Sequence, residues 1–196
     1  MRKIIFTVLI IIVIVFCSFA QMNDMVFGLK GGLSLGRIDS SEPFYPDAEE
    51  KFRIGFAGGA LLIVPVTEKM YIQSELLYVL KGEKMEFGGE DATIIINVME
   101  IPILFKYMIN ESIGFYGGFS MDYILTAEED NPVETRDISE YINNMGFGLT
   151  FGAEYKMDRI LFDGRYNLGI NNIYNTDLGD FELSLNTIYL TVGYLF

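Results

Sequence analysis

The chain has 196 residues, a formal net charge of −13 and no histidine, although 51% of its residues are hydrophobic. The acidic charge argues against nucleic acid and anionic membrane surfaces as partners, because both would repel this protein. The absence of histidine removes the commonest general base and metal ligand. A chain that is apolar, acidic and rich in glycine, tyrosine and phenylalanine is typical of a sheet with one face in lipid and its charges in water.

A basic start and an apolar run over residues 4–16 open the chain, and small residues follow up to Ala20. The run is short for a membrane-spanning helix, so a secretory signal cleaved after Ala20 is favoured over an uncleaved anchor. Phe16 is too bulky beside Cys17, the only cysteine, for a lipoprotein site. Cleavage would remove Cys17, so no disulfide is expected. The expected organisation is a signal peptide over residues 1–20 and an outer-membrane barrel domain over residues 21–196.

Eight later segments alternate between large apolar residues and small or polar ones. This period of two predicts extended strands between two unlike environments. The last segment is the clearest, with Phe196, Tyr194 and Val192 on one face and Gly193 and Thr191 on the other. The predicted strands cover residues 26–35, 52–64, 71–81, 93–109, 113–125, 144–156, 160–171 and 183–196. After the signal, no stretch has convincing helical periodicity.

The connections between these strands alternate in length. Three are short turns, at residues 65–70, 110–112 and 157–159. Four are long and acidic, at residues 37–51, 82–92, 126–143 and 172–182. Short turns at one end and long loops at the other are typical of an outer-membrane barrel, with the short turns in the periplasm. The even strand count places both mature termini on the periplasmic side.

Two barrels compete for this pattern: a transmembrane barrel and a soluble, lipocalin-like barrel with an apolar ligand inside. The interior of an eight-stranded barrel is only about wide enough to be filled by side chains. The apolar faces carry mostly large residues, whereas the opposite faces are rich in glycine, serine and threonine. Large residues fit the convex outside, so the predicted fold class is all-β, an eight-stranded antiparallel up-and-down transmembrane β-barrel.

Aromatic residues and charges refine this assignment. One expected aromatic girdle, at the periplasmic interface, comprises Phe27, Tyr107, Phe115, Tyr155, Phe162, Tyr194 and Phe196. The inward faces carry the basic residues Lys30, Arg53, Lys81, Lys106, Lys156 and Arg165 and the acidic residues Glu75, Glu100, Asp122, Glu154 and Asp163. Unpaired buried charges are costly, so an internal network of ion pairs and hydrogen bonds is expected to plug the barrel.

Two strand motifs carry a family resemblance. They are Ser74–Gly82, which reads SELLYVLKG, and Met99–Tyr107, which reads MEIPILFKY. With the early strand Gly28–Gly32, they resemble the PorT-like outer-membrane β-barrel family of Bacteroidota. The resemblance implies an eight-stranded barrel inserted by the outer-membrane assembly machinery, for which a terminal aromatic residue such as Phe196 is the usual signal. Within the second motif, Pro102 cannot donate to a strand ladder, which predicts a bulge or a gap in pairing.

The sequence offers no sign of catalysis. The lipases and acyl transferases known among outer-membrane barrels depend on histidine, which is absent here, and no catalytic, cofactor-binding or metal-ligating motif is present. Acidic loop residues are the remaining candidates for Ca²⁺ or Mg²⁺ bound beside lipopolysaccharide phosphates, but solvated charge is the preferred interpretation. These residues are Asp39, Glu42, Asp47, Glu49, Glu50, Glu128, Glu129, Asp130, Glu134, Asp137 and Glu140.

We therefore expect a non-enzymatic protein of the cell outer membrane, with a structural, adhesive, or assembly- or secretion-associated role. Its expected partners are outer-membrane lipid, lipopolysaccharide and the assembly machinery, and nucleic acid is not among them. The alternatives are a secreted soluble barrel that binds an apolar ligand, and a narrow channel.

Overall fold

The computed structural model describes residues 25–40, 49–87, 90–175 and 182–196. The expected signal peptide and its cleavage site lie outside the described residues, so the division at residue 20 stays a prediction. In the described part, no helix is long and apolar enough to cross a membrane.

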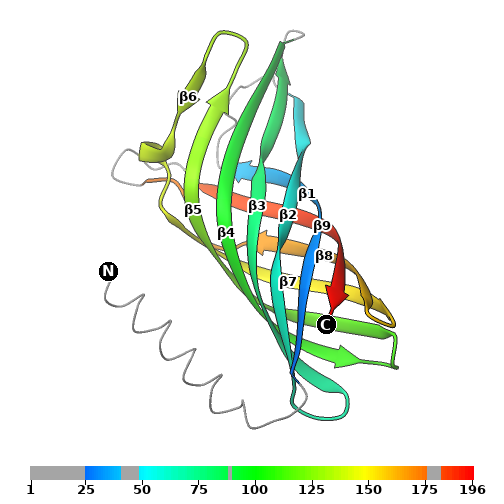
Figure 1. The fold of residues 1–196 in the computed structure, drawn as a ribbon. Coiled ribbons are helices and arrows are strands. Elements are labelled where there is room, and N and C mark those ends of the chain that lie inside the picture. The colour runs from blue at the N-terminus through cyan, green and yellow to red at the C-terminus, as the bar shows by residue number, and fades with distance from the viewer. Residues whose placement is uncertain (1–24, 41–48, 88–89, 176–181) are drawn as a thin grey trace.

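Eight long antiparallel strands form a closed barrel (Figure 1). The sheet order is β4-β3-β2-β1-β9-β8-β7-β5, and pairing of β4 with β5 closes the ring. The eight barrel strands are β1 (Val26–Ser40), β2 (Glu49–Pro65), β3 (Met70–Phe87), β4 (Glu90–Met108), β5 (Ile113–Asp130), β7 (Met145–Met157), β8 (Ile160–Gly169) and β9 (Leu183–Leu195). The short strand β6 (Thr135–Asp137) and the 3-10 helix η1 (Ser139–Tyr141) lie between β5 and β7. The predicted fold class and all eight predicted strands are confirmed.

Several strands are longer than predicted. The acidic segment 82–92, predicted as a loop, is largely strand, because β3 and β4 continue as a hairpin beyond residue 81. Its charges pair across strands, with Lys84 Nζ 2.7 Å from a carboxylate oxygen of Asp91. Figure 1 shows that β2 to β5 rise above the rest of the barrel as a wall. Acidic composition therefore concealed strand structure, and one acidic residue of the segment, Glu83, is buried at 1% exposure.

The predicted break at Pro102 is present on one side of its strand. Pro102 pairs with Ser120 of β5 in unbroken register. On the β3 side, pairing stops at Ser74 with Ile103 and resumes at Leu77 with Glu100. The missing N–H of proline thus interrupts one ladder without shifting the strands.

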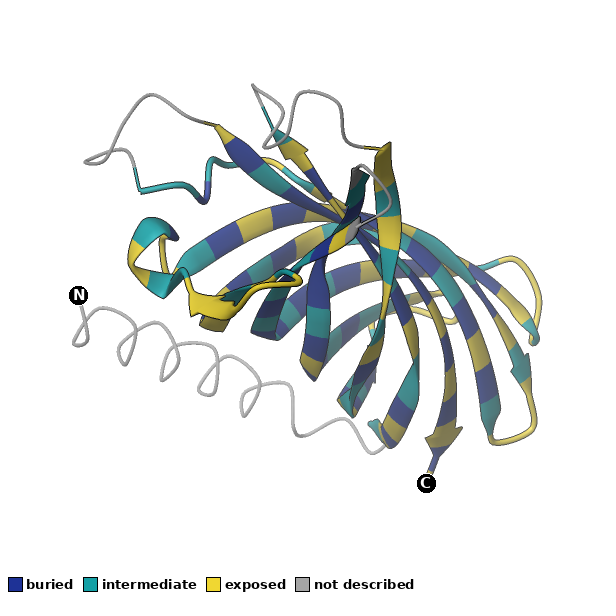
Figure 2. Cartoon of the chain, turned by 90° about the horizontal axis from the view of Figure 1, so that it is seen from above, coloured by how far each residue is buried: buried dark blue, intermediate teal, exposed yellow. Residues whose placement is uncertain are grey.

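The two faces of each strand have the environments that alternation predicted. Buried and exposed residues alternate along the strands in Figure 2. In β9, Leu190 is 55% exposed and Val192 50%, whereas Thr191 is 4% exposed. The exposed large side chains include every member of the predicted girdle: Phe27, Tyr107, Phe115, Tyr155, Phe162, Tyr194 and Phe196. An apolar outer surface of this extent requires a non-aqueous surrounding.

Paired glycines allow the strands to pack closely around a small interior. At Gly118, which faces inward, a Cβ atom would lie 2.0 Å from the carbonyl oxygen of Ile103 on β4. At the adjacent Gly117, which faces outward, the nearest atom to a Cβ would be 3.8 Å away. Only the inward glycine is therefore required by the backbone spacing.

Candidate functional site

The interior of the barrel holds a buried network of charges, and its centre joins opposite walls. Lys30 Nζ of β1 lies 3.2 Å from Glu75 of β3 and 2.9 Å from Asp163 of β8. Arg165 of β8 donates to the other Glu75 oxygen at 2.9 Å. All four side chains are at most 1% exposed. Because β3 and β8 are four strands apart in a ring of eight, the Glu75–Arg165 ion pair crosses the diameter.

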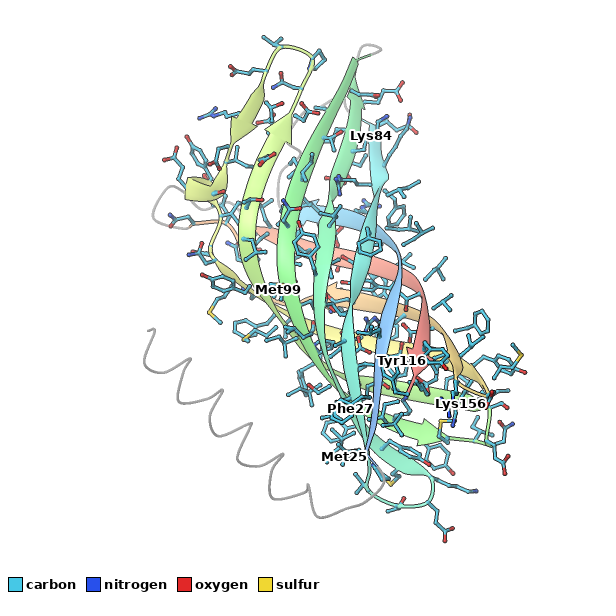
Figure 3. The ribbon with its side chains drawn as sticks, viewed as in Figure 1. Met25, Phe27, Lys84, Met99, Tyr116 and Lys156 are labelled. Atoms are coloured by element: carbon cyan, nitrogen blue, oxygen red, sulfur yellow. The ribbon has the colours of Figure 1, made fainter. Side chains whose placement is uncertain are left out.

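Hydroxyl groups complete the environment of Asp163. The phenol of Tyr116 donates to one oxygen of Asp163. Thr191 Oγ1 of β9 donates to the other oxygen at 3.0 Å. Asp163 therefore has partners on β1, β5 and β9 as well as its own strand, which fixes its position in the middle of the barrel. Tyr116 is labelled inside the barrel in Figure 3.

A second cluster lies toward the end of the barrel that carries the long connections, which is the end expected to be extracellular. Lys81 Nζ of β3 is 2.7 Å from Glu100 of β4 and 2.6 Å from Asp122 of β5. The Tyr189 hydroxyl of β9 donates to Glu100, and this contact also joins strands four apart in the ring. The Arg165 guanidinium carbon lies 4.7 Å from the centre of the Tyr189 ring. This cation–π contact links the two clusters into one network.

A third ion pair lies near the end of the barrel with the short turns, the end expected to be periplasmic, where Lys106 Nζ is 2.7 Å from a carboxylate oxygen of Glu154. Both residues line a cavity of about 420 Å³ that is open to the periplasmic turns. Lys156 also lines it, and in Figure 3 Lys156 and Phe27 are labelled toward the lower end, opposite Lys84. This end of the barrel therefore has a cavity with a mixed apolar and charged lining, next to the buried charge network.

The predicted internal network is largely what the structure shows. Nine of the eleven charges that alternation placed inward form buried ion pairs with one another. Arg53 instead donates to the carbonyl oxygen of Lys81 at 3.4 Å, and Lys156 lies at the periplasmic cavity. The alternation of inward and outward residues along each strand was sufficient to identify these charges. Their ion-pair partners could not be identified in this way, because they depend on how the barrel closes.

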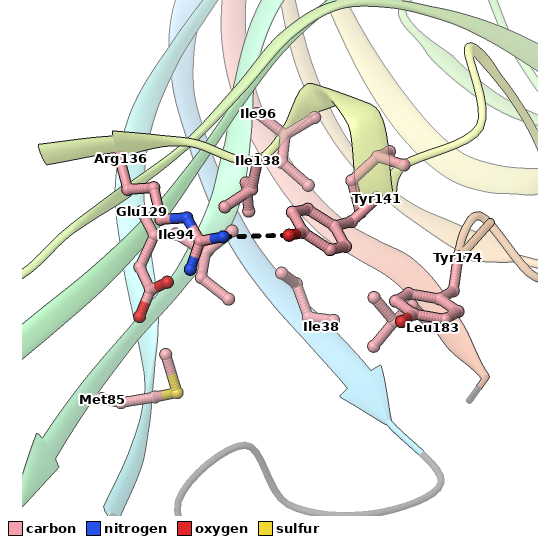
Figure 4. A pocket seen from close by; sticks show the side chains of 11 residues that line it. Ile38, Met85, Ile94, Ile96, Glu129, Arg136, Ile138, Tyr141, Tyr174 and Leu183 are labelled. Carbon is pink, nitrogen blue, oxygen red and sulfur yellow. Dashed lines mark hydrogen bonds between the residues drawn. The ribbon is translucent and has the colours of Figure 1, made fainter. Parts of the chain in front are cut away.

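Sequence reasoning missed an apolar cavity at the extracellular mouth. It has a volume of about 320 Å³, and its aliphatic walls include Ile38, Met85, Ile94, Ile96, Ile138 and Ile142 (Figure 4). Arg136 and Tyr141 form part of its rim, and Arg136 donates to the Tyr141 hydroxyl at 2.9 Å. The run Ile94–Ile96 hid the inward apolar face, because three consecutive isoleucines show no alternation.

The acidic loops contain no evident cation site in the part of the chain that the structure describes. No group of three or more acidic or other ligating residues is placed to hold a metal ion there. Two of the candidate residues, Glu42 and Asp47, lie outside the described residues.

A closed eight-stranded barrel with a lipid-compatible outer belt and a polar interior defines an integral membrane β-barrel. The chain belongs to the family described as "Outer membrane protein beta-barrel domain", which matches residues 19–175. The protein is therefore an integral protein of the cell outer membrane, and the soluble alternative is set aside. The finer PorT-like assignment stays a prediction.

Solved structures support the same fold. Ail, the attachment invasion locus protein of Yersinia pestis, aligns with a TM-score of 0.52 and 14% identity over 89% of this chain and 100% of Ail. Neisserial surface protein A aligns with a TM-score of 0.55 and 11% identity over 87% of this chain and 97% of that chain. Identities this low show the fold alone. No curated protein sequence matches the chain.

Proposed function

We propose that this protein is a non-conducting, non-enzymatic barrel that presents its extracellular rim for adhesion to a basic partner. The observation that carries the proposal is the pair of contacts across the barrel diameter, Glu75 with Arg165 and Glu100 with Tyr189. They occupy the path that a channel would need. Function then belongs to the parts that project from the membrane, and among the described residues the wall formed by β2 to β5 is a prominent one.

The extracellular rim is acidic. Its described acidic residues include Asp39, Glu49, Glu50, Glu86, Asp91, Glu128, Glu129, Asp130, Glu134, Asp137, Glu140 and Glu182. Its basic residues already have partners: Arg37 with Glu50, Lys51 with Glu86, Lys84 with Asp91, and Arg136 with the Tyr141 hydroxyl. A rim of this charge attracts cationic surfaces. Ail has been solved in complex with the heparin analogue sucrose octasulfate, but such a polyanion would be repelled here.

The closed interior predicts that the purified protein gives no resolvable conductance steps in planar lipid bilayers. The physical reason is that an ion would have to displace buried, mutually neutralising charges at two levels. Bilayer recordings over a range of voltages test this, with a large porin as a positive control for insertion. Reproducible steps would overturn the closed interior and favour the narrow-channel alternative.

The adhesive role predicts that Glu134→Gln/Glu140→Gln reduces attachment of protein-bearing cells to a polylysine-coated surface, roughly two- to tenfold at low salt. Both side chains are exposed on the rim. The matched control is Glu68→Gln/Glu111→Gln, which removes the same charge at the periplasmic turns and is expected to leave attachment unchanged. An equal effect of both variants, or of neither, would contradict adhesion through the rim.

An assembly- or secretion-associated role with a periplasmic partner is the second candidate. The PorT-like resemblance and the 420 Å³ periplasmic cavity favour it, and unchanged attachment in the Glu134/Glu140 variant would support it. In either case, lipopolysaccharide is the expected neighbour in the outer leaflet.

We also propose that Phe196, exposed beside Tyr194 at the end of β9, is the residue that the assembly machinery recognises.

A further inference from the structure

We propose that the extracellular cavity binds one uncharged aliphatic molecule that carries a small hydrogen-bonding head group. The walls come from β1, β3, β4 and the segment after β6, and they are aliphatic: Ile38, Met85, Ile94, Ile96, Ile138 and Ile142. The volume of about 320 Å³ falls at the lower end of the range of ligand pockets, roughly 300–1,000 Å³. Unfilled apolar walls forfeit dispersion contacts, which an aliphatic ligand restores.

The roof of the cavity is held by hydrogen bonds on both sides. The Ile138 N–H donates to the Ala127 carbonyl of β5 at 2.9 Å. On the other side, Asn143 Nδ2 donates to the Tyr174 carbonyl at 2.7 Å, and Ile142 and Tyr174 form a β-bridge. These contacts make the cavity a defined space within the fold.

The turn that begins the roof has its own hydrogen bond. The Asp137 carboxylate accepts the Ser139 N–H at 2.9 Å, and this hydrogen bond lowers the pKa of Asp137. The Asp137–Ser139 hydrogen bond therefore fixes the start of η1.

The rim of the cavity selects for an uncharged head group. The Arg136 guanidinium donates to the Tyr141 hydroxyl and lies 5.4 Å from the centre of that ring. Glu129 pairs with Arg136 in the β5–β6 register and also lines the cavity. A carboxylate head would meet Arg136, but it would also meet Glu129 and the acidic rim, whose excess of negative charge opposes it. A hydroxyl or amide can exchange hydrogen bonds with the phenol or guanidinium at no electrostatic cost.

The floor of the cavity confines the ligand to the extracellular end. The cluster of Lys81, Glu100, Asp122 and Tyr189 lies below it, fully buried and mutually bonded. An aliphatic molecule cannot cross these charges without leaving them unpaired. A ligand would therefore enter and leave from the extracellular side, and the inference does not depend on the adhesive function proposed above.

Methyl NMR of the full-length mature protein in lipid nanodiscs tests the site, with 1-decanol as the probe. The chain supplies reporters inside the cavity, the δ1 methyl groups of Ile38, Ile94, Ile96, Ile138 and Ile142. Ile54 and Ile170 face outward and report partition into lipid. We expect saturable shifts at the cavity methyls and only linear, non-saturating shifts at the two lipid-facing ones. Ile96→Phe, which fills the cavity, should weaken binding roughly tenfold or more.

Two further measurements keep the proposal falsifiable. Sodium decanoate should bind at least about tenfold more weakly than decanol, and equal binding would overturn the uncharged head group. Ile142→Phe fills the cavity from the roof and serves if Ile96→Phe fails to fold, as judged by heat-modifiable migration on a gel. If the shifts of the cavity methyl groups never saturate, or equal those of the lipid-facing methyl groups, they would report only partition of decanol into lipid. Either result would overturn the proposed site. If 1-decanol causes no shifts at the cavity methyl groups, the proposed binding site would also be overturned.

Discussion

Replacing Arg165 with methionine is expected to lower the free energy of unfolding by about 3–5 kcal/mol. Arg165 is fully buried, bonds to Glu75 at 2.9 Å and lies over the Tyr189 ring. Methionine has a similar shape but no charge, so Glu75 would keep only Lys30 as an ionic partner and would remain buried. The measurement is equilibrium unfolding in urea with the protein in lipid vesicles, followed by heat-modifiable gel migration.

The position of Arg165 suggests two controls. Arg53→Met removes an inward arginine whose described hydrogen bond is a single long one, to the Lys81 carbonyl at 3.4 Å, so its effect should be about 1 kcal/mol or less. Adding Glu75→Gln to Arg165→Met should recover part of the loss, because it removes the buried carboxylate that has lost its Arg165 partner. A loss below about 1 kcal/mol for Arg165→Met, or strict additivity in the double variant, would contradict the network.

The outer face and the charged interior could both be predicted from sequence, because each depends on local alternation. Once Leu190 and Val192 are assigned to lipid, Thr191 must face inward, and the same parity places Lys30 and Arg165 inside. This alternation does not indicate which residue is the ion-pair partner of each inward charge. Glu75 meets Arg165 only because the ring of eight strands closes with β3 opposite β8, and that is a property of the whole barrel.

The extracellular end was predicted less well, for two physical reasons. Hairpin strands that leave the membrane lose their apolar outer face, so the signal of alternation fades even though the ladder continues, as between Lys84 and Asp91. The apolar cavity also breaks the expected division of faces, because Ile94 and Ile96 point inward while Ile95 points outward. In addition, the roof, formed by the segment after β6, depends on contacts with Ala127 of β5 and with Tyr174, which local alternation does not indicate.

Leu190→Arg is expected to prevent or strongly slow insertion into lipid vesicles and to destabilise any inserted protein by about 2–4 kcal/mol. Leu190 lies midway along β9, is 55% exposed on the outer face and pairs with Leu33 and Gly164 of the flanking strands. A guanidinium there would lie near the bilayer centre, without a partner from the interior network. Folding yield in vesicles and urea unfolding measure the effect, and Phe151→Arg on β7, 53% exposed, should behave in the same way.

Thr191→Ser is the matched control for both arginine variants. It changes the adjacent, inward residue and keeps the hydroxyl that donates to Asp163 at 3.0 Å. Its loss is one methyl group, which costs about 1 kcal/mol and does not affect insertion. The contrast between residues 190 and 191 tests the register directly, because a shift of one residue would exchange their environments. Normal insertion of both arginine variants would show that this face does not contact lipid, and the outer-membrane arrangement of the strands would have to be abandoned.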